Sequence, residues 1–226
     1  MAIRSIAIAQ LVGAVPFAVG SACFVNAAWA DEWVLPFRIG CAVWIGGCLP
    51  YLWPPLRSAY VGTGVGASVA TRLAAHVSNA LQVASMLSWF VGSAYAFHED
   101  IDVGIMVTKA TYLGGSACLL VDAVLQARTL LSATRDEQAS LLADLLAGLF
   151  YTIAGSFEGY ATVLGLMRFG SCCWLVASLF SCVRPCVALW PCKGRRAPSR
   201  KSVELEQVQV MAPMPATEVS SARAGD

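Results

Sequence analysis

The chain has few charged residues and few of the side chains that usually build metal sites. Charged residues make up 13% of its 226 residues, and there are only two histidines. A soluble domain carries about 25% charged residues, so this deficit excludes an ordinary soluble globular protein. The net charge of +1 gives the chain no electrostatic attraction to nucleic acid.

Motifs that carry chemistry are also absent. The sequence contains no phosphate-binding glycine-rich loop with a lysine, no His-Glu-x-x-His and no Gly-x-Ser-x-Gly. Most of the nine cysteines lie inside apolar runs, where they behave as small hydrophobic residues rather than as a disulfide framework. We therefore expect no cofactor, no metal site and no enzymatic activity.

Apolar residues, by contrast, are abundant and arranged in long blocks. Hydrophobic residues make up 58% of the chain. A membrane-crossing helix needs about 20 such residues, and in lipid the backbone must satisfy its own hydrogen bonds. The sequence therefore predicts an all-α, polytopic membrane protein with six transmembrane helices, at Ile6–Trp29, Leu35–Trp53, Leu73–Phe97, Val103–Ala127, Leu141–Phe157 and Leu164–Trp190. The first block resembles a signal peptide ending at Ala28-Trp29-Ala30, but its length favours a retained span.

The breaks between blocks group the helices into three hairpins. We expect hairpins at 1–57, 73–132 and 133–191, a Gly-rich linker at 58–72 and a disordered cytosolic tail at 192–226. Pro50, Pro54 and Pro55 are expected to end the second span, because proline cannot continue a helix.

Lysine and arginine predict the orientation. With the N-terminus in the cytosol, 12 of the 15 basic residues lie on the inner side, and only Arg38, Lys109 and Arg168 lie outside. This bias predicts that both termini face the cytosol. It does not identify which cellular membrane holds the protein.

Pairs of small residues recur along the predicted helices and suggest an internal repeat. Small residues let helix backbones approach closely in lipid, and serine can donate a hydrogen bond across the contact. Aromatic residues lie near each pair. The expected packing residues are Gly20, Ser21, Gly92, Ser93, Gly115, Ser116, Gly155, Ser156, Gly170 and Ser171, with Gly40-Cys41 as a sixth pair.

The third hairpin resembles the YrhK domain, a two-helix membrane module of unknown function. The matching positions are Gly155, Ser156, Glu158, Phe169, Gly170, Ser171, Arg184 and Pro185, and the aromatic residue expected three positions before Gly155 is replaced by Thr152. The first two hairpins resemble the module more weakly. The resemblance implies a membrane hairpin, but no activity, cofactor or catalytic residue.

Polar residues within the predicted spans are the candidates for a functional site. An ionisable side chain in a span is costly, so Asp122 should face the interior of the bundle. His76, Asn79 and Gln82 follow one another at a spacing of three, which places them on one helix face, where Asp122 could meet them. This face is either a polar seam between helices or a path for protons, ions or small solutes. Asp144 is expected to be an interfacial charge near a helix N-terminus.

The inner end of the last span carries cysteines beside basic residues. Cys182, Cys186 and Cys192 are candidates for acylation, and the nearby basic cluster could attract anionic lipid. Two roles therefore remain open. The first is a non-enzymatic structural or assembly component that packs with itself or with a membrane-protein partner. The second is a small transporter or channel that uses the polar face and Asp122.

Overall fold

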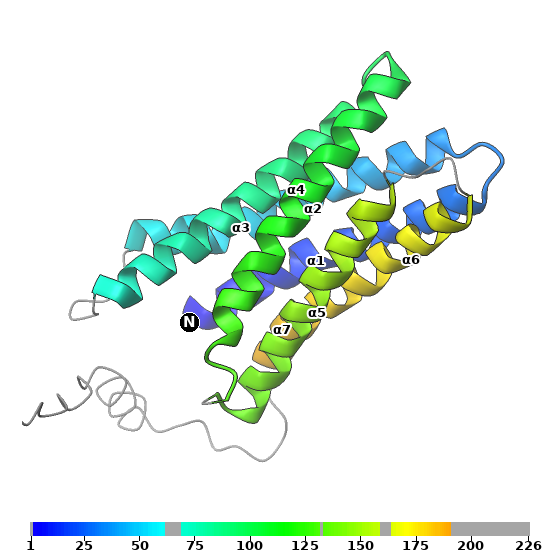
Figure 1. The fold of residues 1–226 in the computed structure, drawn as a ribbon. Coiled ribbons are helices and arrows are strands. Elements are labelled where there is room, and N and C mark those ends of the chain that lie inside the picture. Colours follow the sequence, from blue (N-terminus) through cyan, green and yellow to red (C-terminus); the bar gives the residue numbers. More distant parts are fainter. Residues whose placement is uncertain (1, 62–68, 132, 159–163, 191–226) are drawn as a thin grey trace, which may run out of the picture.

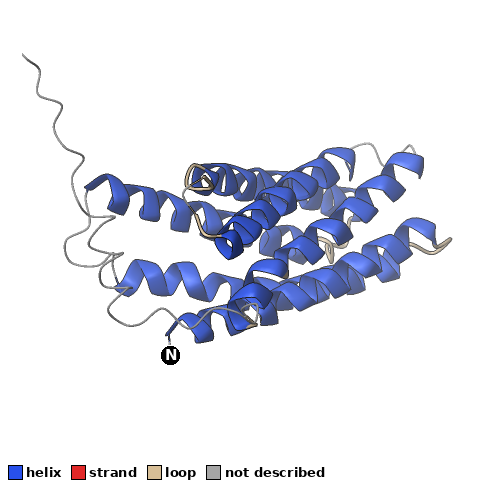
Figure 2. Cartoon of the chain, turned by 90° about the horizontal axis from the view of Figure 1, so that it is seen from below, coloured by secondary structure: helices blue, strands red, loops and turns tan. Residues whose placement is uncertain are grey.

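The computed structural model describes the backbone of residues 2–61, 69–131, 133–158 and 164–190. These residues form helices and their connections, with no strand among them (Figures 1 and 2). The expected all-α architecture is thus confirmed, while the predicted tail lies outside the described residues. The elements are α1 (Ala2–Trp29), α2 (Val34–Val61), α3 (Val69–Tyr95), α4 (Ile101–Ala127), α5 (Arg135–Glu158), α6 (Leu164–Ser181) and the short α7 (Val183–Leu189).

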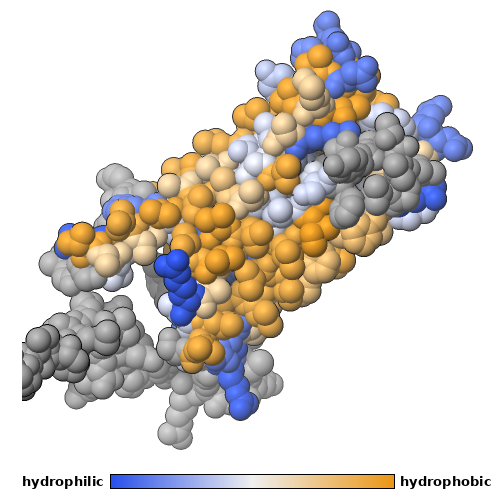
Figure 3. All heavy atoms as spheres, in the orientation of Figure 1, coloured by the Kyte–Doolittle hydropathy of each residue, from blue (hydrophilic) through white to orange (hydrophobic). Residues whose placement is uncertain are grey.

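The surface of the bundle is compatible with a lipid bilayer. Five stretches are long and apolar enough to cross a membrane, in α1, α2, α4, α5 and the α6–α7 unit. Helix α3 is equally long, but polar residues such as Arg72 and Asn79 lower its hydropathy. Because α3 packs between α2 and α4, we treat it as the sixth crossing helix. Figure 3 shows apolar side chains over the flank of the bundle and hydrophilic ones mainly toward its ends.

The six long helices form a closed ring. Each packs on its neighbours in sequence, and α6 returns to pack on α1. Among the described residues, the backbones of helices across the ring do not approach one another, and these helices meet only through central side chains such as Trp44 and Tyr151. Successive helices run in opposite directions, so α1, α3 and α5 begin at the same end of the bundle (Figure 1). We call this the N-terminal end.

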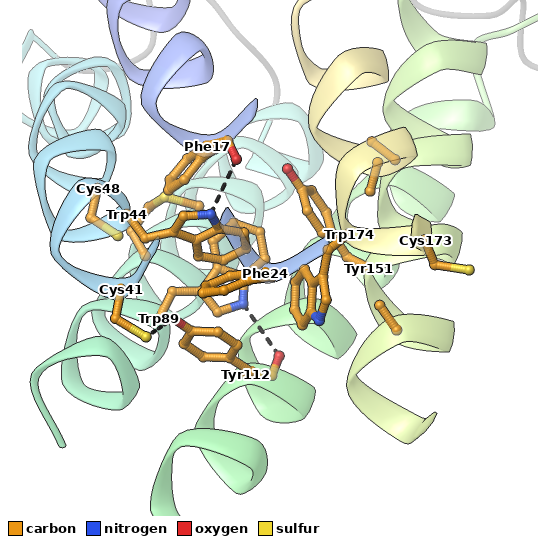
Figure 4. Close-up of a cluster of buried hydrophobic side chains, with 14 of the residues drawn as sticks. Phe17, Phe24, Cys41, Trp44, Cys48, Trp89, Tyr112, Tyr151, Cys173 and Trp174 are labelled. Atoms are coloured by element: carbon orange, nitrogen blue, oxygen red, sulfur yellow. Dashed lines mark hydrogen bonds between the residues drawn. The ribbon is translucent and has the colours of Figure 1, made fainter. Parts of the chain in front are cut away.

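The centre of the ring is filled by bulky aromatic side chains, one from each long helix. Each is at most 1% exposed. Neighbouring rings touch edge to face, obliquely or stacked, with centroids 4.8 Å apart for Trp89 and Tyr151 and 5.0 Å apart for Trp44 and Trp174. We call this set the aromatic layer (Figure 4): Phe17, Trp44, Trp89, Tyr112, Tyr151 and Trp174.

The polar atoms of the aromatic layer find partners inside the bundle. The indole N–H of Trp44 donates to the carbonyl of Phe17 at 3.1 Å, and that of Trp89 donates to the carbonyl of Tyr112 at 3.2 Å (Figure 4). The hydroxyl of Tyr112 lies 2.6 Å from that of Ser93. Burying these side chains therefore leaves neither indole N–H unsatisfied, which removes the main cost of placing tryptophan in a core.

Small residues make room for the aromatic layer. In every long helix, a buried small residue stands four positions before the aromatic residue and another stands three positions after it. The backbones approach closely at these points. For example, a Cβ atom added to Gly20 would overlap Trp44 Cδ1 and lie 2.8 Å from the carbonyl oxygen of Gly40. The flanking pairs are Gly13 and Gly20, Gly40 and Gly47, Ser85 and Gly92, Thr108 and Gly115, Ala147 and Ala154, and Gly170 and Ala177.

The predicted packing residues are buried with one exception, because Ser156 is exposed. Ser21 contacts the hydroxyl of Ser178 on α6 at 2.9 Å. Ser116 and Ser171 instead donate to carbonyls of their own helices.

The predicted pairs do not share one register. Gly115-Ser116 follows its aromatic residue, whereas Gly170-Ser171 and Gly40-Cys41 precede theirs. Relative to the aromatic layer, the pairs on α2 and α6 therefore stand about two helical turns from the pair on α4. The internal repeat itself stays a prediction.

Two expectations about helix ends were wrong. Helix α2 continues through Pro50, Pro54 and Pro55 to Val61, and α3 begins at Val69, so only 62–68 of the predicted linker lies between the helices. Proline is tolerated within membrane helices because neighbouring groups can satisfy the carbonyls that it frees. The last span, predicted as continuous, breaks after Ser181.

At the break in the last span, a side chain from another helix replaces the backbone hydrogen-bond donor that a proline lacks. Pro185 has no N–H to donate to the carbonyl of Ser181 four residues earlier. The hydroxyl of Tyr51 on α2 donates to that carbonyl instead, at 3.3 Å.

Two arginines join adjacent helices at the end opposite the N-terminal end. Arg38 of α2 donates to the carbonyls of Ala96 and His98, just beyond the last residue of α3. Arg168 of α6 donates to the carbonyl of Ala28 at the last turn of α1 and stacks over Trp29. Carbonyls at a helix C-terminus lack partners within the helix and favour a positive charge. Two of the three basic residues expected outside therefore have a structural role.

The close packing at Gly20 predicts a specific loss of stability. Gly20→Leu should force α1 away from α2 and lower the melting temperature of the detergent-solubilised protein, because overpacking costs about 1–3 kcal/mol or more. Gly46→Leu is the matched control, since an added Cβ at Gly46 meets nothing within 4 Å. Equal melting temperatures for the two variants, measured by tryptophan fluorescence, would contradict the packing described above.

Candidate functional site

A polar cavity lies between the helices on the N-terminal side of the aromatic layer. About 60 Å³ of it is accessible to the centre of a water molecule, within about 690 Å³ of space between atoms that includes open solvent. Phe17, Trp89 and Tyr151 of the aromatic layer form part of its wall. The polar lining comes from every long helix and from α7: Gln10, Tyr51, Gln82, Asp122, Gln126, Asp144, Ser181 and Arg184.

Asp122 of α4 is the most deeply buried charged group in this cavity. Its residue is only 3% exposed. One carboxylate oxygen, Oδ2, accepts hydrogen bonds from the amides of Gln82 at 2.8 Å and Gln126 at 2.9 Å. The other oxygen, Oδ1, is buried and has no hydrogen-bond partner among the described residues. An unsatisfied carboxylate oxygen in such surroundings is costly, so it points to a ligand or to a proton.

A second carboxylate in the cavity is paired. Asp144 of α5 lies 2.8 Å from a guanidinium nitrogen of Arg184 on α7. The same guanidinium donates to the side-chain oxygen of Gln126 at 3.2 Å. Gln126 therefore links the two carboxylates, since its N–H donates to Asp122 and its oxygen accepts from Arg184. The result is one polar network running from α3 through α4 and α7 to α5.

The charges of this network do not balance. Among the described residues, two carboxylates and one guanidinium line the cavity, and Arg184 is the only basic side chain in that part of the lining. With both carboxylates ionised, the cavity carries one excess negative charge. Arg184 is held by Asp144, so the excess falls on Asp122. A charge at this depth is expensive unless it is paired, and such residues in membrane proteins usually mark ion or substrate sites.

The aromatic layer closes the cavity on its far side. Beyond Phe17, Trp89 and Tyr151, the remaining rings of the layer are also at most 1% exposed. Trp44 and Tyr112 are stacked with centroids 5.1 Å apart, and Tyr112 and Trp174 meet edge to face at 5.3 Å. The described residues thus form a vestibule that ends at the aromatic layer rather than an open pore.

The structure brings together some of the polar residues singled out in the sequence and separates others. Gln82 contacts Asp122, as the shared helix face suggested. His76 is exposed, and neither His76 nor Asn79 lines the cavity. Near the last span, Cys182 donates to the carbonyl of Ser178. Cys192 and the basic residues that follow it lie outside the described part of the chain.

Sequence reasoning missed Asp144, Arg184, Gln126 and Tyr51 as members of the site. The expectation that Asp144 is an interfacial charge near a helix N-terminus was wrong, because Asp144 lies more than two turns into α5 and faces the cavity. One signal was available, since Gln126 follows Asp122 by four residues and so shares its helix face. The pairing of Asp144 with Arg184 required knowledge of the ring, which places α5 beside α7.

The described residues contain no group of three or more His, Cys, Asp or Glu side chains that could hold a metal ion. Comparisons with models of protein families, with curated proteins and with solved structures gave no match. The resemblance of the third hairpin to the YrhK module therefore stays a prediction, and the cavity is the feature of the structure that points to a function.

The ion pair in the cavity predicts a measurable coupling between its two members. Asp144→Asn and Arg184→Met should each lower the melting temperature of the solubilised protein, because each leaves a partly buried charge without its partner. The double variant should lose less unfolding free energy than the two single variants lose together. The difference, a coupling free energy of about 0.5–3 kcal/mol, is usual for residues in direct contact. Strictly additive losses would show that the two side chains do not interact.

Proposed function

We propose that this chain is a non-enzymatic, multi-pass membrane protein that binds a cation at Asp122 and carries it across the bilayer. The observation that supports this function is the buried, unpartnered Oδ1 atom of Asp122 facing a polar cavity. A bound cation neutralises the excess negative charge of the cavity and gives Oδ1 of Asp122 a partner. The distribution of basic residues supports a cytosolic location for both termini and hence for the mouth of the cavity.

The closed aromatic layer favours a transporter over a channel. A channel needs a continuous path, whereas the cavity reaches only one side of the layer. A transporter exposes its site to each side in turn, so a vestibule that is closed at one end corresponds to one of its states. Passage of the cation then requires the aromatic layer to separate.

An assembly role receives less support. That role depended on the Gly-Ser pairs as contacts between hairpins or with a partner helix. The contacts of Gly20, Gly92 and Gly115 are with other helices of this same chain. These glycines pack α1 against α2 and α3 against α4, so their contact surfaces are already occupied within the chain.

Charge movement in reconstituted vesicles tests the proposal. Purified protein in liposomes should give capacitive currents on a solid-supported membrane when one of a panel of cations is applied, comprising H⁺, Na⁺, K⁺, ammonium and benzylammonium. Asp122→Asn should reduce the current at least ~10-fold, because it removes the charge but keeps the shape and the acceptor oxygen for Gln82. Asp102→Asn, an exposed change in the same helix, should leave the current unchanged.

Two results would overturn the proposed function. One is the absence of current for every cation of the panel with protein that remains folded, as judged by its melting temperature. The other is a current that Asp122→Asn and Asp102→Asn affect equally, since transport would then not depend on the buried carboxylate.

A further inference from the structure

The chemistry around Asp122 narrows the class of cation. This inference rests on the proposed function and concerns the same cavity. Within the Asp122 carboxylate, Oδ1 is the one oxygen without a hydrogen-bond partner among the described residues. The amide groups of Gln82 and Gln126 turn their N–H atoms, not their oxygens, toward Asp122. The oxygen of Gln126 already accepts from Arg184.

An inorganic metal ion fits such surroundings poorly. Calcium takes about six to eight oxygen ligands and magnesium about six. Potassium sites are built from rings of several carbonyl oxygens. The described residues offer no cluster of three candidate metal ligands. One carboxylate oxygen therefore replaces only a small part of the hydration shell of an inorganic ion.

The walls of the cavity have a different character. Aromatic rings from α1, α2, α3 and α5 line it, namely Phe17, Tyr51, Trp89 and Tyr151. Three of these rings form a contiguous surface, since the centroids of Phe17 and Trp89 are 5.5 Å apart and those of Trp89 and Tyr151 are 4.8 Å apart. Met86 and Leu119 add apolar surface. Aromatic faces attract organic cations, and apolar walls take up the carbon body of such a ligand.

We infer that the cation bound in this cavity is a small organic ammonium ion that carries at least one N–H group and an apolar body. The N–H donates to Oδ1 of Asp122 and satisfies the oxygen that the protein leaves without a partner. The positive charge cancels the excess negative charge of the cavity. The apolar body lies against the aromatic rings. A quaternary ammonium ion lacks the N–H, and a neutral alcohol lacks the charge.

Binding of three matched probes to the purified full chain in detergent tests this inference. Benzylammonium has the N–H, the charge and the apolar body, benzyltrimethylammonium lacks the N–H, and benzyl alcohol lacks the charge. By isothermal titration calorimetry, benzylammonium should bind at least ~10-fold more tightly than either relative. Asp122→Asn should abolish this preference, and Asp102→Asn should preserve it.

A pair of variants at Tyr51 tests the aromatic wall separately. Tyr51→Phe keeps the ring but removes the hydroxyl that contacts Ser181, so it should bind benzylammonium more tightly than a variant without the ring. Tyr51→Leu removes the ring and should weaken binding several-fold. Equal affinities for the two variants, with both proteins folded, would overturn the role assigned to the wall.

The outcomes separate this inference from the proposed function. Two outcomes overturn the inference but leave cation transport in place. One is equal affinity for benzylammonium and benzyl alcohol, and the other is an Asp122-dependent charge movement with inorganic cations alone. Asp122-dependent binding of benzylammonium without any charge movement supports the inference and overturns transport. Absence of both binding and charge movement overturns both.

Discussion

The interlocking of large aromatic side chains with small residues at the centre of the ring is the contact on which the rest of this structure depends. Lipid tails give helices no hydrophobic reason to associate, so a membrane bundle must be held by close packing and internal hydrogen bonds. Here each long helix contributes one aromatic residue to the layer and two small residues that admit the rings of its neighbours. Because every helix takes part, the layer closes the ring and sets the distance between helices.

The same arrangement explains why polar residues can lie within the membrane-crossing part. The ring keeps Gln82, Asp122 and Gln126 away from lipid, and the aromatic layer separates their cavity from the opposite end. Arg184 pairs with Asp144, which leaves Asp122 with one carboxylate oxygen that nothing in the described chain satisfies. A group that served only as a seam between helices would be expected to have its polar atoms paired. In our proposal, the unpaired oxygen is the feature that favours a binding site over a seam.

The sequence was sufficient for those parts of the structure that depend on local physics. The apolar blocks predicted the six long helices, and the expected ends at Trp29 and Ala127 agree with the structure. The expectation that Asp122 meets the polar face of α3 rested on helical spacing, and Gln82 lies there. Predictions from local sequence failed where a side chain from another helix makes the decisive contact. Tyr51 takes over a hydrogen bond that Pro185 cannot make, and Arg184 reaches Asp144 only because the ring places α7 beside α5.

Closure of the ring between α1 and α6 is the central claim, and a disulfide between these helices tests it most directly. The hydroxyl oxygens of Ser21 and Ser178 lie 2.9 Å apart. In a cysteine-free protein with a protease site between α4 and α5, Ser21→Cys combined with Ser178→Cys should keep the two fragments joined after oxidation in the membrane. Ser85→Cys with Ser178→Cys, on helices across the ring, should not. Separation of the fragments in both cases would contradict the closed ring, and with it the cavity that the ring encloses.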